Sequence, residues 1–101
     1  MEVVITNQSL TRLEEALYYY ITELNMPVEK AIKIKDKLLF RAKSLGDYPL
    51  KGQFEPFLSE LKQGHRRIIE GNFKIIYRIE NDIIYIVDFF DGRVDPKKMK
   101  N

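Results

Sequence analysis

The sequence predicts an α+β fold in which two helices pack on one face of a mostly antiparallel, four-stranded sheet. Apolar residues recur at helical spacing between residues 9 and 45, whereas the second half of the chain alternates apolar and polar residues in three runs. Two amphipathic helices cannot bury both apolar stripes against each other, so the apolar face of the sheet must cover them. The expected order is β-α-α-β-β-β, in a single domain over residues 1–101.

The first strand and the first helix have clear local signals. Val3-Val4-Ile5 is short, β-branched and bounded by polar residues, which predicts a strand. Ser9 is a candidate N-cap, and Thr11 with Glu14 forms an alternative capping box. The helix is expected to run to about Asn25. Its apolar stripe comprises Leu10, Leu13, Leu17, Tyr20, Ile21 and Leu24.

A second helix is expected from Pro27, a residue that suits the first helical turn. Its apolar stripe comprises Ala31, Ile34, Leu38, Leu39, Ala42 and Leu45. Turn-forming residues from Gly46 to Gln53 end this helix and begin a loop. The apolar residues that follow either tuck the loop against the core or form a short helical turn; they are Phe54, Phe57, Leu58 and Leu61.

Three strands complete the predicted fold, at residues 65–70, 73–80 and 83–90. Gly71-Asn72 and Asn81-Asp82 supply the two tight turns between them. The segment around Asp95-Pro96 is expected to be a frayed helical turn or a free tail.

Strand alternation sorts the side chains of the first hairpin onto two faces. With Gly71-Asn72 as the loop, Glu70 opposes Phe73 and Arg67 opposes Ile76, and opposed residues share a face. One face is then a core, with Ile68, Phe73, Ile75 and Tyr77, and the other is basic, with His65, Arg67, Lys74 and Arg78. We expect the basic face to stay open to solvent or to a partner.

The third strand adds aromatic residues to this picture. If Asn81-Asp82 is a two-residue turn, Tyr85 and Phe89 join the basic face, where they are candidates for stacking on nucleobases or for anchoring a protein partner. The same register puts Asp88 on the core face. A buried carboxylate needs a partner, so either a bulge intervenes or Asp88 holds a nearby base.

Composition narrows the class of protein. With 45% hydrophobic and 32% charged residues and a net charge of +2, the chain is expected to be globular. It has no cysteine, which excludes disulfides, and only one histidine. We therefore expect neither a metal site nor a cofactor. We find no secretion signal and no apolar run of membrane-spanning length, so no membrane partner is expected and the cytoplasm is the expected location. A small-molecule substrate is not expected either.

The basic face is the main candidate for chemistry. His65 titrates near neutrality when unperturbed, and it shares its face with Arg67, Lys74 and Arg78, with Arg93 just beyond the last strand. Such a group could hold a scissile RNA phosphate and stabilise the charge that develops on it. The alternative is a solvated face whose charge serves solubility.

Three consecutive tyrosines, Tyr18, Tyr19 and Tyr20, lie on the first predicted helix. At helical spacing only one or two of them can face the core. The others either dock another protein's helix or keep their hydroxyl tips in water.

The sequence resembles the RelE/ParE superfamily of toxins from bacterial type II toxin–antitoxin modules. The resemblance rests on the order of the elements, on the Leu45…Pro49…Gly52 loop, on the strand pair around Gly71-Asn72-Phe73-Lys74, and on the ending from Ile86 to Pro96. It implies a small toxin held inactive by a cognate antitoxin that wraps it with an extended segment and a helix.

The resemblance implies two alternative targets. RelE-like members cut messenger RNA on the ribosome, and their basic positions fall here on His65, Arg67, Lys74 and Arg93. Their C-terminal tyrosine is missing, because its position falls near Met99. ParE-like members inhibit DNA gyrase without these residues, and the Phe90-Asp91-Gly92-Arg93 ending favours that branch. Further candidates for contact with RNA or a target are Arg66, Arg78, Tyr85, Phe89, Lys97 and Lys98.

Three hypotheses therefore stand: a gyrase inhibitor without catalysis, a ribosome-dependent endoribonuclease, or a non-toxic relic that only binds the antitoxin. The ParE-like ending favours the first.

Overall fold

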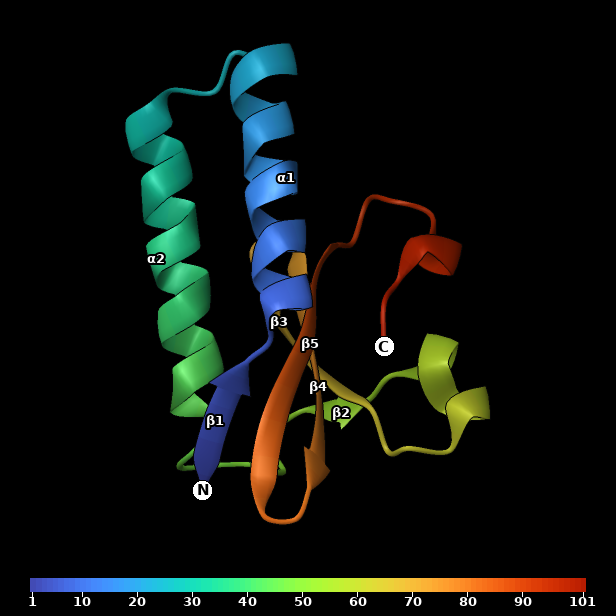
Figure 1. Ribbon diagram of the computed structural model, residues 1–101. Coiled ribbons are helices and arrows are strands. Elements are labelled where there is room, and N and C mark those ends of the chain that lie inside the picture. Colours follow the sequence, from blue (N-terminus) through green and yellow to red (C-terminus); the bar gives the residue numbers. More distant parts are fainter.

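The computed structural model describes all residues, 1–101, as two helices against one mixed sheet (Figure 1). The chain runs through β1 (Glu2–Ile5), α1 (Asn7–Glu23), α2 (Val28–Ser44), β2 (Gln53–Phe54), a 3₁₀-helix η1 (Pro56–Leu61), β3 (Arg66–Glu70), β4 (Phe73–Glu80), β5 (Ile83–Asp91) and a 3₁₀ turn η2 (Pro96–Lys98). The predicted α+β class and element order are confirmed, with one strand more than expected.

The sheet has five strands in the order β1-β5-β4-β3-β2. β1 pairs parallel with β5, and all other pairs are antiparallel. The additional strand is β2, whose two residues pair with Arg66 and Arg67. Two residues are too few to display alternation, so the sequence pattern predicts a loop at Gln53 and no strand at Phe54.

Both helices lie on the same side of the sheet (Figure 1). Their buried apolar residues are Leu13, Leu17 and Tyr20 of α1 and Ala31, Leu38 and Ala42 of α2, which pack on Ile68, Phe73, Ile75 and Tyr77 of the sheet. The predicted core face is therefore confirmed. Leu24 of the expected stripe is exposed.

Helix α1 begins three residues earlier than its predicted cap implied. The side chain of Thr6 accepts a hydrogen bond from the Ser9 backbone N–H at 3.1 Å, and the Ser9 hydroxyl donates to the Thr6 carbonyl at 2.8 Å. Thr6 is thus the N-cap, and Ser9 completes a reciprocal pair of bonds that stabilises the first turn.

A β-bulge at Val87 resets the alternation of β5. Ile76 pairs with Asp88 and Tyr77 pairs with Ile86, so Val87 has no partner across the ladder. Residues after the bulge exchange faces relative to strict alternation. Phe89 therefore lies in the core beneath the helices and not on the basic face, so that prediction is wrong. Asp88, which strict alternation places on the core face, lies on the opposite face.

The second face of the sheet is not open, contrary to expectation. The chain covers part of it with η1 on one side and the segment after β5 on the other (Figure 1). Leu58 and Met99 from these segments pack on Ile76, Val87 and Phe90 as a second, smaller core. The 54–61 region forms the expected helical turn, and of its apolar residues only Leu58 tucks against the sheet. Phe54, Phe57 and Leu61 are exposed.

Candidate functional site

The basic residues of the first hairpin share the second face of the sheet, as their register predicts, but a buried carboxylate occupies the space between two of them. Glu55 Oε1 lies 3.0 Å from Lys74 Nζ and 3.6 Å from Arg67 Nε, and Glu55 is only 1% exposed. Its second oxygen accepts the Phe57 N–H at 3.0 Å and so caps η1. Arg67 also donates to the Phe54 carbonyl. Both cations are therefore engaged by one buried carboxylate, and their side chains are only 19% and 21% exposed.

His65 is buried rather than displayed. Neither ring nitrogen makes a hydrogen bond of good geometry. Burial lowers the pKa of His65, the backbone of Asn101 opposes this, and the positive charge of Arg78 lowers the pKa further. The folded protein therefore favours the neutral imidazole. A proton donor for RNA cleavage would have to be charged and accessible, and His65 is neither.

Arg78 and Tyr85 form a pair at the edge of the same face. The guanidinium carbon of Arg78 lies 5.1 Å from the centre of the Tyr85 ring, and the guanidinium also bonds to Glu80. Tyr85 is half-buried against the second core. Its predicted place on this face is confirmed, whereas Phe89 lies on the other side of the sheet.

Arg66 faces the helical side of the sheet edge. Its Nη1 donates to the Gly52 carbonyl at 2.7 Å, and its guanidinium carbon lies 4.1 Å from the centre of the Phe54 ring. Gly52 is buried here and donates its N–H to the Tyr77 hydroxyl at 2.9 Å. A Cβ at position 52 would stand 2.6 Å from that hydroxyl oxygen, so the loop needs glycine for this close approach.

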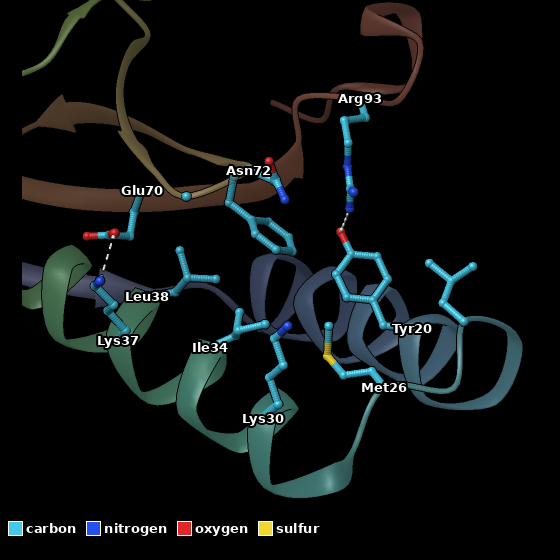
Figure 2. A pocket seen from close by; sticks show the side chains of 12 residues that line it. Tyr20, Met26, Lys30, Ile34, Lys37, Leu38, Glu70, Asn72 and Arg93 are labelled. Carbon is cyan, nitrogen blue, oxygen red and sulfur yellow. Dashed lines mark hydrogen bonds and ion pairs between the residues drawn. The ribbon is translucent and has the colours of Figure 1, made fainter.

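Arg93 lies apart from the other predicted basic residues, in a cluster with Tyr20 and Asp91. Figure 2 shows its hydrogen bond to Tyr20. Its Nη2 donates to the Tyr20 hydroxyl at 2.7 Å and to Asp91 Oδ2 at 3.0 Å, while the Tyr20 hydroxyl donates to Asp91. Burial and the Asp91 charge raise the pKa of Tyr20 to about 12. Although burial opposes it, hydrogen bonds from Arg93 and Tyr20 lower the pKa of Asp91. The cluster ties α1 to the end of β5.

Asp88 resolves the question that its sequence position raised, because the bulge and the nearby base are both present. Burial raises the pKa of Asp88, and this is opposed by the Lys100 N–H, which donates at 2.8 Å, and by Arg12, whose Nε lies 3.3 Å away. Arg12 also donates to the Lys98 carbonyl at 2.9 Å. The exposed Lys97 and Lys98 are therefore carried on a segment that is tied to the sheet.

A groove opens between the two helices and the β3–β4 turn (Figure 2). Its volume is about 370 Å³, and Met26, Ile34 and Phe73 form part of its apolar floor. Lys30, Lys37 and Arg93 also line it, and Lys37 Nζ lies 3.4 Å from Glu70. The groove is thus apolar inside and basic at its rim, which suits a peptide segment with mixed apolar and acidic character.

Sequence reasoning missed three side chains that organise these sites: Glu55, Asp91 and the hydroxyl of Tyr20. The Glu55-Pro56 pair carried one usable signal, since proline suits the first position of a helical turn and marks Glu55 as the residue before it. Nothing in the local pattern indicated that Glu55 would also meet Arg67 and Lys74, because that contact joins segments far apart in the sequence.

Comparison with known proteins settles the family. The family model described as the ParE toxin of the type II toxin–antitoxin system, parDE, matches residues 3–96. The chain belongs to the ParE toxin family. Membership identifies a type II toxin of the RelE/ParE superfamily and implies a cognate antitoxin as its partner.

A solved structure supports the fold of this ParE family member. The chain is similar to one described as the chromosomal ParDE TA system from P. aeruginosa, with a TM-score of 0.70 and 21% identity over 88% of this chain and 92% of that chain. No curated protein sequence matches it significantly. None of its helices is long and apolar enough to cross a membrane.

Proposed function

We propose that this ParE family toxin acts without catalysis, by binding and inhibiting DNA gyrase, and that its antitoxin neutralises it by binding the folded toxin. The observation that supports a non-catalytic mechanism is the state of the basic positions. Arg67 and Lys74 share the buried carboxylate of Glu55, and Arg93 is held by Asp91 and Tyr20.

The endoribonuclease alternative requires different properties of the same residues. Cleavage by attack of a 2′-hydroxyl needs cations free to hold the phosphate and a group that exchanges protons at neutral pH. His65 is the one histidine, and its burial favours the uncharged ring. The position of the tyrosine that RelE-like members use falls near Met99, whose thioether cannot exchange protons.

The proposal is tested with the purified toxin. Gyrase is assayed for supercoiling of relaxed plasmid at rising toxin concentrations, with the antitoxin added in a parallel series. We expect inhibition that the antitoxin reverses. In cells, induction is expected to produce DNA breaks with intact messenger RNA.

Two results would contradict the proposal. Messenger RNA cut at ribosomal A sites, and lost in Arg67→Ala and Lys74→Ala variants, would establish the nuclease. Normal growth on induction, with gyrase unaffected in vitro, would establish a relic that only binds its antitoxin.

A further inference from the structure

A second groove lies between α1 and α2, and we call it the outer groove. Leu17 and Ala31, which are buried in the core, form its floor, and Tyr18, Val28 and Ile32 stand along its walls. Its volume is about 220 Å³. No residue of the sheet lines it, whereas the β3–β4 turn contributes to the groove of Figure 2. The outer groove therefore opens on the side of the helix pair that faces away from the sheet.

The walls of the outer groove are exposed apolar side chains. Tyr18 is 69% exposed, Val28 52% and Ile32 53%. Both helices contribute to the walls, and the buried floor beneath them fixes the spacing between the helices. Exposed apolar side chains that line one groove are typical of interaction surfaces, and walls that are already in place lower the entropic cost of binding.

The rim of the outer groove is acidic. On a helix surface, residues three and four positions apart are neighbours. The charged residues at these distances from Tyr18, Val28 and Ile32 are four acids and one base: Glu14, Glu15, Glu29, Asp36 and Lys35. Lys35 pairs with Glu14 at 3.2 Å, which leaves the other three acids without an ion pair. Four acids against one base give the rim a net charge of −3, in a chain whose net charge is +2.

The other cations of the two helices lie away from the outer groove. By lining and by helical spacing, three lysines share the side of α2 that borders the groove of Figure 2: Lys30, Lys33 and Lys37. Two arginines form ion pairs with acids of the sheet: Arg12 and Arg41. Lys43 lies about three helical turns from Ile32. The negative rim is therefore a local feature of this face.

The groove and its rim indicate the chemistry of the partner. A helix that carries apolar side chains on one face, with lysine or arginine beside them, is complementary in shape and in charge. The rim repels the phosphate groups of a nucleic acid. A second copy of this chain, docked about a two-fold axis, brings the same carboxylates to the contact and is disfavoured.

We propose that the outer groove docks a basic amphipathic helix of a partner protein. The apolar side chains of that helix insert between Tyr18 of α1 and Ile32 of α2, and its cations pair with Glu15, Glu29 and Asp36. This surface is separate from the groove of Figure 2, whose rim is basic, and it does not require gyrase as the target of the toxin.

The probe for this site is a synthetic helical peptide of about 18 residues, with leucine at i, i+3, i+4 and i+7 spacing and lysine at the remaining positions. Its counterpart has glutamate in place of every lysine. Each peptide is titrated into isotope-labelled toxin, and the nuclear magnetic resonance shifts of the backbone amides give both the Kd and the location of the contact.

Two pairs of substitutions test the apolar walls. Tyr18→Ser with Ile32→Ser removes one wall residue from each helix. Tyr19→Ser with Phe40→Ser is the matched control, since these side chains also come one from each helix and are exposed, but do not line the outer groove. Thermal unfolding checks that each variant is folded. A third variant, Glu29→Lys with Asp36→Lys, keeps the walls and reverses the charge of the rim.

The lysine peptide is expected to shift amides of α1 and α2 around the outer groove, and the glutamate peptide to bind at least about tenfold more weakly. The wall variant should lose at least about tenfold in affinity for the lysine peptide, and the control should stay within about twofold of wild type. The rim variant should weaken binding of the lysine peptide and strengthen binding of the glutamate peptide. If the wall variant fails to fold, the rim variant carries the test alone.

Several results would overturn the inference. They are absence of lysine-peptide binding to the wild-type toxin, equal affinity for the two peptides, and equal losses in the wall variant and the control. A toxin dimer in sedimentation equilibrium that the wall variant abolishes would assign the outer groove to a second copy of the chain. Loss of antitoxin binding in the wall variant would assign it to the antitoxin.

Discussion

Replacing Glu55 with glutamine tests how the second face of the sheet is held together. The substitution keeps the size of the side chain and the oxygen that caps η1, but it removes the charge that Lys74 and Arg67 share at 3.0 and 3.6 Å. At an effective dielectric constant of about 20, each of these attractions amounts to roughly 5 kcal/mol before desolvation is subtracted.

The expected net loss is smaller than the sum of these attractions. Desolvation of the buried carboxylate offsets several kcal/mol, and breaking a buried pair typically costs about 3–5 kcal/mol. The Arg67 and Lys74 side chains remain 19% and 21% exposed, so water partly compensates them once the carboxylate charge is gone. We expect Glu55→Gln to lower the free energy of unfolding by about 2–3 kcal/mol, or the melting temperature by roughly 10–20 °C.

Urea unfolding followed by far-ultraviolet circular dichroism measures this loss, and Glu60→Gln is the matched control. Glu60 is an exposed acid on the same 3₁₀-helix, so its substitution should change stability by less than about 0.5 kcal/mol. Adding Lys74→Gln to Glu55→Gln should recover part of the loss, because it removes an unpaired cation. A Glu55→Gln protein as stable as wild type would refute the reasoning.

Three further predictions concern other parts of the fold. Phe89→Ala should cost about 3–5 kcal/mol and Tyr85→Ala clearly less, since the bulge buries the first ring in the main core; equal losses in urea unfolding would contradict the bulge. Gly52→Ala should cost about 1–3 kcal/mol, because its Cβ would meet the Tyr77 hydroxyl at 2.6 Å; an unchanged melting temperature would mean that the loop yields freely. The pKa of His65 is lowered in the folded state, so below about pH 6.5 the unfolded state binds more protons than the folded state. Stability should therefore decrease as the pH is lowered through this range. His65→Gln should flatten that part of the melting temperature profile; an unaltered profile would show that another group is responsible.

Local patterns predicted the hairpin register and the helices, and failed where distant segments meet. The pairing of Glu70 with Phe73 and of Arg67 with Ile76 follows from the turn and the alternation, and the structure has both pairs. The cover of the second face was not predictable in this way, because Leu58 and Met99 stand in short segments without periodicity. Their burial depends on long-range packing.

The same limit applies to the candidate site, where local patterns predicted the face of each residue but not its long-range contacts. Alternation placed His65, Arg67, Lys74 and Arg78 on one face, but it could not reveal that Glu55 folds onto two of them. It raised a bulge as one of two alternatives, through the core position that it gave Asp88, but it could not place the extra residue, since Val87 is as apolar as its neighbours and carries no turn signal.

The bulge at Val87 also limits how relatives can be aligned. Before the bulge, aligned residues of two family members lie on the same side of the sheet as long as the alignment has no gap. Downstream, that correspondence holds only for members with the same extra residue, and a single-residue gap in an alignment exchanges inside for outside from Asp88 onward. Any functional position transferred to the end of this strand should first be checked for that gap.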